Sequence, residues 1–193
     1  MKRSFVIAAL VAVALPSATW SAAPDMSHAA RAEAYAREFL ASIQADPQMI
    51  AALAASTEKH RRLDYEQSQG LDKQWRNERV YDRGGHGPLV DEVMGGPFSA
   101  WLKGRRDASV GGAVTDILVM DGLGWNAGQT DGTSDFYQGD EDRWQRTFAG
   151  GSALVSSVEE GDGRKLVQVS LPIAEGDRNT GAVTIGLDLG KLP

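Results

Sequence analysis

The chain has 193 residues, of which 42% are hydrophobic and 24% are charged, proportions that suit one globular domain with one sizeable core. It contains no cysteine, which excludes disulfides, thiolate metal sites, a thiol nucleophile and the lipid-modified cysteine of a bacterial lipoprotein. A net charge of −6 without a basic stripe argues against binding to nucleic acid.

The first segment has the pattern of a secretory signal peptide. Lys2 and Arg3 precede an unbroken apolar run over residues 5–15, and small residues follow it. This run is shorter than the roughly 17–25 residues that a membrane-spanning helix needs. We therefore expect residues 1–22 to be removed and residues 23–193 to form a single periplasmic domain without a membrane span. Because the segment carries two positive residues and no acid, the mature domain is more acidic than the whole chain.

The first half of the mature chain has helical periodicity. Residues 26–44 are predicted to form a long helix, because apolar residues recur there at spacings of three and four. Asp46 followed by Pro47 indicates the N-cap and first residue of a short second helix. A polar stretch over residues 58–79 is also predicted to be helical, with its basic run solvated. The residues expected to face inward are Met26, Ala29, Ala32, Ala36, Phe39, Leu40 and Ile43 in the first helix, and Met49, Ile50 and Leu53 in the second.

The second half changes to the alternation of β-strands. After a glycine pair at 111–112, five β-branched or alternating segments are separated by glycine-rich turns, which predicts an antiparallel sheet with one face on a helical layer. The sequence has no βαβ rhythm, so we predict a single α+β domain. The expected strands are residues 113–121, 125–130, 152–158, 165–173 and 181–189.

Three segments resemble one known family. They are the hairpin "ILVMDGLGWNAGQT", the acidic segment "TSDFYQGDEDRWQ", and the final pair "VQVSLPIAEGDRNTGAVTIGLDL", in which Gly181, Val183, Ile185 and Gly186 match the family's G-x-V-x-I-G form. The sequence thus resembles the single Cache domain, also called PDC, an extracytoplasmic sensor fold. The resemblance implies an antiparallel PAS-like sheet of about five strands with a long N-terminal helix and a helical lead-in. It also implies a pocket on one face of the sheet for a small polar metabolite, such as an organic acid or an amino acid.

The sequence departs from a typical receptor of this family in two ways. Its first segment has a cleavable pattern, and it ends after the last predicted strand, where a receptor continues into a second membrane helix and an effector module. We therefore expect a soluble periplasmic sensor domain that acts in signal transduction through a membrane-bound signalling partner. The alternative is an interaction or structural module with a Cache fold whose pocket is filled by Trp125 or Met120.

The acidic segment, residues 133–145, has two interpretations. Gly139 and Asp140 predict a turn and an N-cap, with Glu141 and Asp142 in the first turn of a following helix, so the acids need no function beyond structure. In this interpretation Trp144 and Phe148 form the buried face of that helix, and Arg143 and Arg146 are solvent-exposed ion-pair partners. In the other interpretation the aromatic residues wall a ligand pocket, since such pockets combine apolar walls with a few polar groups.

The resemblance implies a binding site under the loop 131–140, on the side of the sheet away from the long helix. Asp135 is expected to be the polar anchor and Tyr137 the wall, with Gln168 and Ser170 on the floor. The predicted ligand-binding residues come from the hairpin, the loop, the following helix and the fourth strand: Trp125, Asp131, Ser134, Asp135, Tyr137, Trp144 and Gln168.

Metal and catalytic sites are not predicted. Four oxygen-bearing residues of the loop could suit calcium, but the EF-hand spacing is absent. The sequence has no nucleophile elbow and no zinc-binding H-E-x-x-H motif, and its histidines lie far from the acidic segment along the chain. We therefore expect no catalytic residue, no metal, no cofactor and no enzyme activity. The four oxygen-bearing residues are Asp131, Ser134, Asp135 and Asp140, and the three histidines are His28, His60 and His86.

Overall fold

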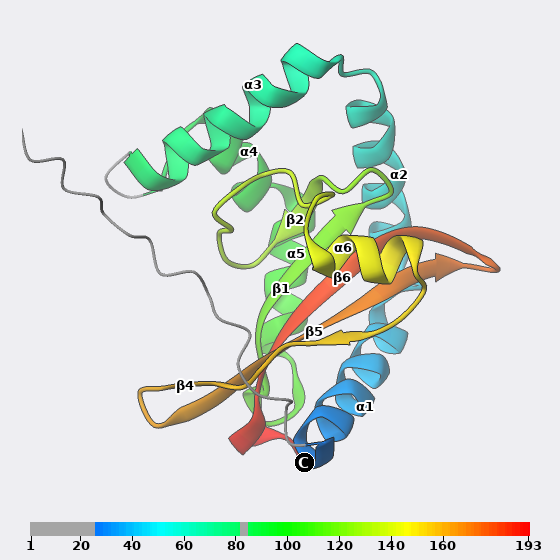
Figure 1. Cartoon of the computed structure of the whole chain (residues 1–193), viewed down its shortest axis with the longest axis vertical. Helices are drawn as coiled ribbons and strands as arrows, with labels where there is room; N and C mark the ends of the chain where they lie inside the picture. The colour runs from blue at the N-terminus through cyan, green and yellow to red at the C-terminus, as the bar shows by residue number, and fades with distance from the viewer. Residues whose placement is uncertain (1–25, 82–84) are drawn as a thin grey trace, which may run out of the picture.

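The computed structural model describes residues 26–81 and 85–193, so the expected signal peptide lies outside the described residues. The first half is helical, as predicted (Figure 1). Within the described part, no helix is both long enough and apolar enough to cross a membrane. The helical elements are α1 (Met26–Ile43), α2 (Pro47–Arg61), α3 (Tyr65–Arg76), the π-helical turn η1 (Asn77–Tyr81), α4 (Pro88–Gly95), α5 (Pro97–Asp107) and the 3₁₀ turn η2 (Val110–Gly112).

The second half forms one antiparallel sheet, which confirms the predicted α+β class and the PAS-like sheet behind a long first helix. The strand order is β2-β1-β6-β5-β3, and β4 pairs with the start of β5. The chain between β2 and β3 carries the short helix α6 (Asp142–Trp144) and the π-helical turn η3 (Gln145–Ala149). The strands are β1 (Val114–Asp121), β2 (Asn126–Gln129), β3 (Leu154–Val155), β4 (Glu159–Gly161), β5 (Arg164–Glu175) and β6 (Arg178–Asp188), and the 3₁₀ turn η4 (Leu189–Lys191) follows.

The main core lies between one face of this sheet and the helices α1, α2 and α5. Alternate residues of β5 and β6 point into it, as their period-two pattern predicted. Ala32, Ala36, Leu40 and Ile43 of α1 are buried against them, as the helical spacing predicted. Burying a side chain of the size of Leu40 or Ile43 contributes about 1.5–3 kcal/mol. The strand residues in this core include Val167, Val169, Leu171, Ile173, Val183, Ile185 and Leu187.

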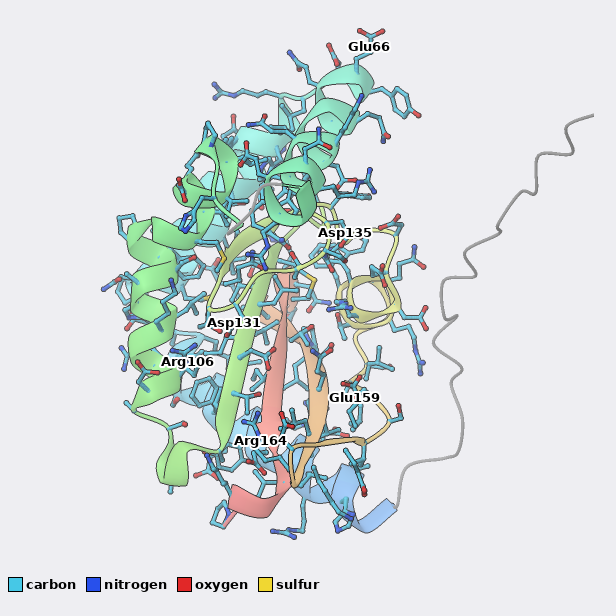
Figure 2. The ribbon with its side chains drawn as sticks, turned by 90° about the vertical axis from the view of Figure 1, so that its left-hand side faces the viewer. Glu66, Arg106, Asp131, Asp135, Glu159 and Arg164 are labelled. Atoms are coloured by element: carbon cyan, nitrogen blue, oxygen red, sulfur yellow. The ribbon has the colours of Figure 1, made fainter. Side chains whose placement is uncertain are left out.

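The opposite face of the sheet, here called the outer face, is not covered by these helices. Figure 2 shows α5 on one side of the sheet, and on the other the segment after β2 with α6. The outer face carries polar side chains among its apolar ones, because every second strand residue points there. These polar residues include Asp116 on β1, Gln168 and Ser170 on β5, and Thr184 on β6.

Two helical predictions were wrong in detail. The helix α2 continues to Arg61, and the polar helix expected over residues 58–79 is interrupted before α3. Asp64 begins α3 through a reciprocal capping box, in which its carboxylate accepts the N–H of Gln67 at 2.8 Å. Ile50, expected to be inside, is 40% exposed, because Met49 and Leu53 occupy the buried face of α2. The predicted N-cap at Asp46 is confirmed, with its side chain accepting the N–H of Gln48.

Three predictions in the strand half also need correction. The strand expected at 152–158 is reduced to two residues, and a hairpin of β4 and β5 appears where none was expected. That hairpin turns at Asp162 and Gly163 with φ of 51° and 73°, the left-handed pair that an Asp-Gly sequence permits. The helix after the acidic segment has Glu141 at its N-cap position without a side-chain hydrogen bond, so the expected cap at Asp140 was wrong.

Candidate ligand-binding site

A loop crosses one end of the outer face, and we call residues 131–139 the roof segment. It is tied to β2 and the preceding turn by backbone contacts: Trp125 and Tyr137 form a β-bridge, and the N–H of Gln138 donates to the oxygen of Gly124 at 2.7 Å. The amide of Asn126 on β2 donates to Thr133 Oγ1 at 2.9 Å and to the backbone oxygen of Asp135 at 3.3 Å. The roof segment is therefore a fixed cover rather than an unanchored loop.

A cavity of about 180 Å³ lies between the roof segment and the outer face of the sheet. It is on the side away from α1, where the sequence placed the site. Four of the predicted residues line it: Asp131, Ser134, Asp135 and Gln168 (Figure 2 labels the first and third). The other lining residues come from β1, the roof segment, α6 and β6: Asp116, Ile117, Leu118, Gly132, Thr133, Gln138, Arg143 and Thr184.

Asp116 is the carboxylate at the floor of this cavity, and sequence reasoning missed it. Among the described residues, its side chain accepts one hydrogen bond, from Thr115 Oγ1 at 2.7 Å. It lies opposite Gly186 on β6, and a methyl group at Gly186 would overlap the Asp116 carboxylate. Burial raises the pKa of Asp116; its bond from Thr115 opposes that shift, and the nearby charge of Asp131 adds to it.

The other charged groups of the cavity differ in how they are bound. Asp131 accepts Arg106 Nη1 and Thr130 Oγ1, at 3.3 and 3.0 Å. Asp135 Oδ1 accepts Gln138 Nε2 at 2.8 Å and Ser134 Oγ at 3.1 Å. Arg143 makes no ion pair with any residue in the described part of the chain, contrary to its expected role as a surface ion-pair partner. Its guanidinium is thus the available cation at the cavity, and it lowers the pKa of Asp116.

The three aromatic residues expected at the site do not line the cavity. Trp125 is 5% exposed and packs in an aromatic cluster with Trp75, Phe136 and Tyr137. The rings of Trp125 and Tyr137 lie 4.8 Å apart, and burial raises the pKa of the Tyr137 hydroxyl. Trp144 stacks on Phe148 and donates its indole N–H to the backbone oxygen of Asp121. These residues support the roof segment and its flanks from outside the cavity.

Ser170, expected on the floor, lies just behind the lining. It is buried, and its hydroxyl is 2.8 Å from that of Thr184, which does line the cavity. Ser170 on β5 and Thr184 on β6 are directly opposite each other in the strand register. Ser170 therefore orients the hydroxyl of Thr184, and Thr184 contacts the cavity.

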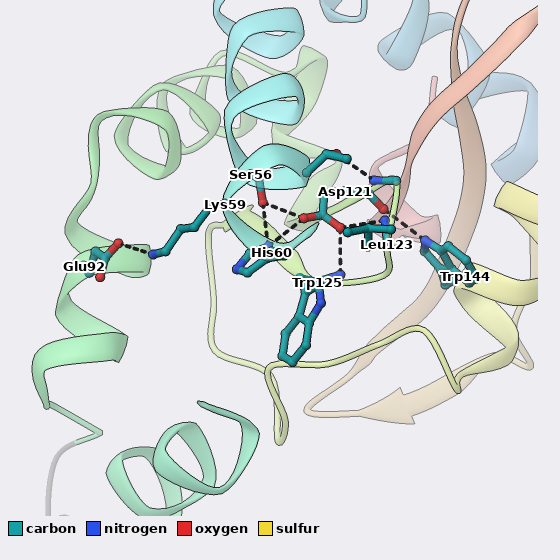
Figure 3. Close-up of polar contacts among 10 residues, drawn as sticks. Ser56, Lys59, His60, Glu92, Asp121, Leu123, Trp125 and Trp144 are labelled. Atoms are coloured by element: carbon teal, nitrogen blue, oxygen red, sulfur yellow. Dashed lines mark hydrogen bonds and ion pairs between the residues drawn. The ribbon is translucent and has the colours of Figure 1, made fainter. Parts of the chain in front are cut away.

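A second polar cluster, missed in the sequence, joins α2 to the β1–β2 hairpin (Figure 3). The fully buried carboxylate of Asp121 accepts His60 Nδ1 at 2.7 Å, Ser56 Oγ at 2.8 Å, and the N–H groups of Leu123 and Trp125. His60 was expected on a solvated helix face but is 5% exposed, with its ring 5.1 Å from that of Trp125. His60 Nδ1 is the nitrogen that contacts the carboxylate, and Nε2 has no partner among the described residues. The buried cluster fixes the hairpin and offers no access to a substrate.

The described residues include no group of three or more histidine, aspartate and glutamate side chains placed to hold a metal ion. Of the four residues considered for calcium, Asp131 and Asp135 have their carboxylates bound to protein donors, and Asp140 does not line the cavity.

No family model and no curated protein sequence matches this chain. Among solved structures, it is similar to the sensor domain of the V. cholerae histidine kinase DctB, with 12% identity, a TM-score of 0.38, and 86% of this chain and 57% of that chain covered. It is also similar to the ligand-binding domain of the Pseudomonas aeruginosa amino-acid chemoreceptor PctC with GABA (14%, TM-score 0.35, 83% and 62%). A third similar structure is the ligand-binding domain of the Campylobacter jejuni chemoreceptor Tlp3 with 4-methylisoleucine, with 10% identity, a TM-score of 0.35, and 84% of this chain and 56% of that chain covered.

These three structures are sensor or ligand-binding domains, the class of domain that the sequence resemblance predicted. The chain spans about three fifths of the length of each. Similarity as low as this carries no argument about the ligand or the activity of this chain, so both have to be argued from the cavity itself.

Proposed function

We propose that this protein is a sensor domain that binds a small zwitterion, an amino acid or a short amino-carboxylate, in the cavity under the roof segment. The observation that carries the proposal is Asp116, a partly buried carboxylate on the cavity floor with a single hydrogen bond in the described structure. Partial burial makes the charge of this carboxylate less favourable than in water, and a cationic partner offsets that cost. A ligand ammonium group beside Asp116 would supply that partner.

The balance of charge in the lining selects the ligand class. Three carboxylates and one guanidinium line the cavity, which disfavours a dicarboxylate and favours a cation. Arg143, without an ion pair in the described part of the chain, can hold a carboxylate through paired N–H groups. Of the two ligand classes implied by the sequence resemblance, the cavity therefore supports the amino acid over the organic acid.

The volume limits the size of this ligand. A cavity of about 180 Å³ corresponds to about six water molecules at ~30 Å³ each. It is smaller than the roughly 300–1,000 Å³ of pockets for drug-sized ligands. The expected ligand has about six to eight non-hydrogen atoms, the size of alanine, serine or GABA.

The remaining parts of the proposal rest on the sequence. A periplasmic location is supported by the signal-peptide pattern of residues 1–22, and action through a membrane-bound partner by the resemblance to receptor sensor domains. The alternative of a filled pocket is not favoured, because Met120 and Trp125 are buried in other clusters and leave the cavity open.

A thermal-shift comparison tests the ligand class. Glycine, L-alanine, L-serine and GABA are compared with succinate and putrescine, which carry only one kind of charge. A bound ligand at 100 times its dissociation constant stabilises the protein by about 2.7 kcal/mol. Asp135→Ala and Arg143→Gln should remove the shift, whereas Tyr137→Phe should keep it, since Tyr137 lies outside the lining. A response to succinate alone, or to none of the six compounds, would contradict the proposal.

A further inference from the structure

The roof segment has a second set of contacts on the side away from the cavity, and they come from α3. Asp72 Oδ1 accepts the N–H groups of both Phe136 and Tyr137, at 2.9 and 3.1 Å. Its other oxygen pairs with Arg76, one turn later on the same helix, at 2.7 Å. Asp72 is 9% exposed, so a single carboxylate from α3 holds the backbone of the roof segment in a largely water-free environment.

Trp75 of α3 makes the second contact. Its side chain is fully buried, and its indole N–H donates to the backbone oxygen of Thr133 at 3.0 Å. Its ring also stacks on Phe136, with the ring centres 5.2 Å apart and the planes inclined by 23°. Asp72 and Trp75 therefore hold the roof segment near both of its ends.

The same short segment faces the cavity. Thr133, Ser134, Asp135 and Gln138 line it, and Thr133 and Asp135 are joined by a hydrogen bond of 2.7 Å from Oγ1 to the backbone oxygen. A group that moves Thr133 or Asp135 from inside the cavity thus moves the peptide groups to which α3 is bound. One layer of chain separates the ligand site from α3.

The helix α3 is not part of the main core. Trp75 belongs to the aromatic cluster with Leu89, Val90, Trp125 and Phe136, which is separate from the core between the sheet and α1, α2 and α5. In Figure 1, α3 runs across the end of the molecule beyond the roof segment. Elements outside the main core open at lower free energy than the core itself. A shift of α3 with the roof segment therefore involves β2, to which the roof segment is bonded, and leaves β1, β5 and β6 in place.

We propose that the roof segment and α3 form one coupled unit, in which Asp72 is the positioning residue and α3 responds to occupation of the cavity. The part that concerns the ligand rests on the proposed function; the coupling of the two elements does not. Coupling between two binding events is equal in both directions. If a ligand tightens the contact between α3 and the roof segment, a substitution that loosens this contact weakens ligand binding by the same factor. A ligand that binds equally well whether α3 is tight or loose against the roof segment would not change the balance between these two states.

Amide hydrogen exchange of the ligand-free protein tests the coupling. Asp72→Ala removes the acceptor of two backbone N–H groups, and we expect exchange at Phe136 and Tyr137 to accelerate about 10-fold or more, as for loss of hydrogen bonds to a charged group. Residues 65–76 should accelerate in parallel, and β1, β5 and β6 should not change. Asp72→Asn restores an acceptor and should return most of the protection. Arg76→Gln, which removes only the ion pair, is the matched control and should have a much smaller effect.

Two results would overturn the coupling. One is acceleration of the roof segment in Asp72→Ala without any change over residues 65–76. The other is equal acceleration in β1, β5 and β6, which would mean that the variant loosens the whole fold.

Binding of L-alanine, measured by calorimetry, tests the link to the cavity. We expect Asp72→Ala to weaken binding about 10-fold and Asp72→Asn to recover most of it. The emission of Trp75 is obtained as the difference in fluorescence between the wild type and Trp75→Phe. We expect this emission to change when L-alanine is added. Unchanged affinity in Asp72→Ala would overturn the link to the cavity. Absence of binding by the wild type would count against the proposed function and against the response of α3 to L-alanine, while the exchange experiment would still decide the coupling.

Discussion

The substitution Asp116→Asn separates the stability of the protein from its function. In the folded protein the pKa of Asp116 is raised, chiefly by burial, so the folded state binds its proton more tightly than the unfolded chain does. Stability therefore falls as pH rises from the ordinary aspartate pKa through the raised value, and the loss persists at higher pH. Asparagine is uncharged at every pH and nearly the same shape. We expect Asp116→Asn to be more stable than the wild type at pH 7 and similar to it at pH 3.

The same substitution should remove ligand binding. The asparagine side chain would still accept the hydroxyl of Thr115, but it carries no charge to balance a ligand ammonium group. At 100 times the dissociation constant, the wild type gains about 2.7 kcal/mol from its ligand. For a domain of this size, 1 kcal/mol corresponds to about 2–4 °C in melting temperature. The ligand-dependent shift of about 5–11 °C should therefore disappear in the variant, although its unliganded melting temperature is higher.

Calorimetric or fluorescence melts between pH 3 and pH 8, with and without L-alanine, provide the measurement. Asp177→Asn is the matched control, because Asp177 is exposed in the turn between β5 and β6. The reasoning is refuted if Asp116→Asn is less stable than the wild type at pH 7, or if it retains the full ligand-dependent shift. A gain in stability that is equal at pH 3 and pH 7 would show that the carboxylate charge is not its cause.

Three further predictions follow from single contacts. Asp121→Ala leaves four donors, two of them buried and two partly buried, without their acceptor, and should lower the free energy of unfolding by about 3–5 kcal/mol in urea titrations; a loss below about 1 kcal/mol would contradict its structural role. Gly186→Ala displaces the Asp116 carboxylate and should abolish the L-alanine shift, with about 1–3 kcal/mol lost by overpacking; retained binding would place the ligand elsewhere. Trp125→Phe should retain L-alanine affinity within about 3-fold by calorimetry, because Trp125 packs outside the cavity lining. Loss of binding at unchanged stability would show that Trp125 contacts the ligand.

The elements that the sequence predicted are those fixed by local patterns. The two long strands β5 and β6 alternate apolar and other residues over enough positions to define their buried face. Asp46 before Pro47 defines the start of α2 by chemistry that needs no tertiary contact. The two-residue strand β3 has no such pattern, because its pairing with β5 depends on where the chain returns after η3.

His60 had a signal that was not used. Met49, Leu53, Ser56 and His60 follow each other at spacings of four, three and four, which is one face of a helix. The charged neighbours of His60 suggested a solvated face, but they lie on the other sides of the same turn and are exposed. A helical-face criterion would have placed His60 inside; its partner Asp121, 61 residues away, depends on tertiary packing.

The sequence placed its candidate site where the structure has a cavity, but only four of the seven predicted residues line that cavity. Asp131, Ser134 and Asp135 follow from a polar loop beside a sheet edge, a local property, and Gln168 follows from the alternation of β5. Tyr137 and Trp144 do not line the cavity because their rings pack on Trp125 and Phe148, respectively. The sequence alone does not show these contacts. The pairing of Asp116 with Gly186 depends on the register between β1 and β6, which joins residues far apart in sequence. An isolated aspartate in an apolar strand was visible, but the glycine that makes room for it was not identifiable as its partner.

Two aspartates of the same strand show why Asp116 is the better indicator of function. Asp121 is the more deeply buried, yet its carboxylate accepts four hydrogen bonds, so its charge is balanced entirely within the protein. Asp116 has one described hydrogen bond and faces a cavity that Arg143 also lines. Partial burial makes the charge of Asp116 unfavourable in the ligand-free protein, and its single described hydrogen bond does not offset that cost fully. Its presence at the floor of the cavity is explained if the missing hydrogen bonds come from the ligand.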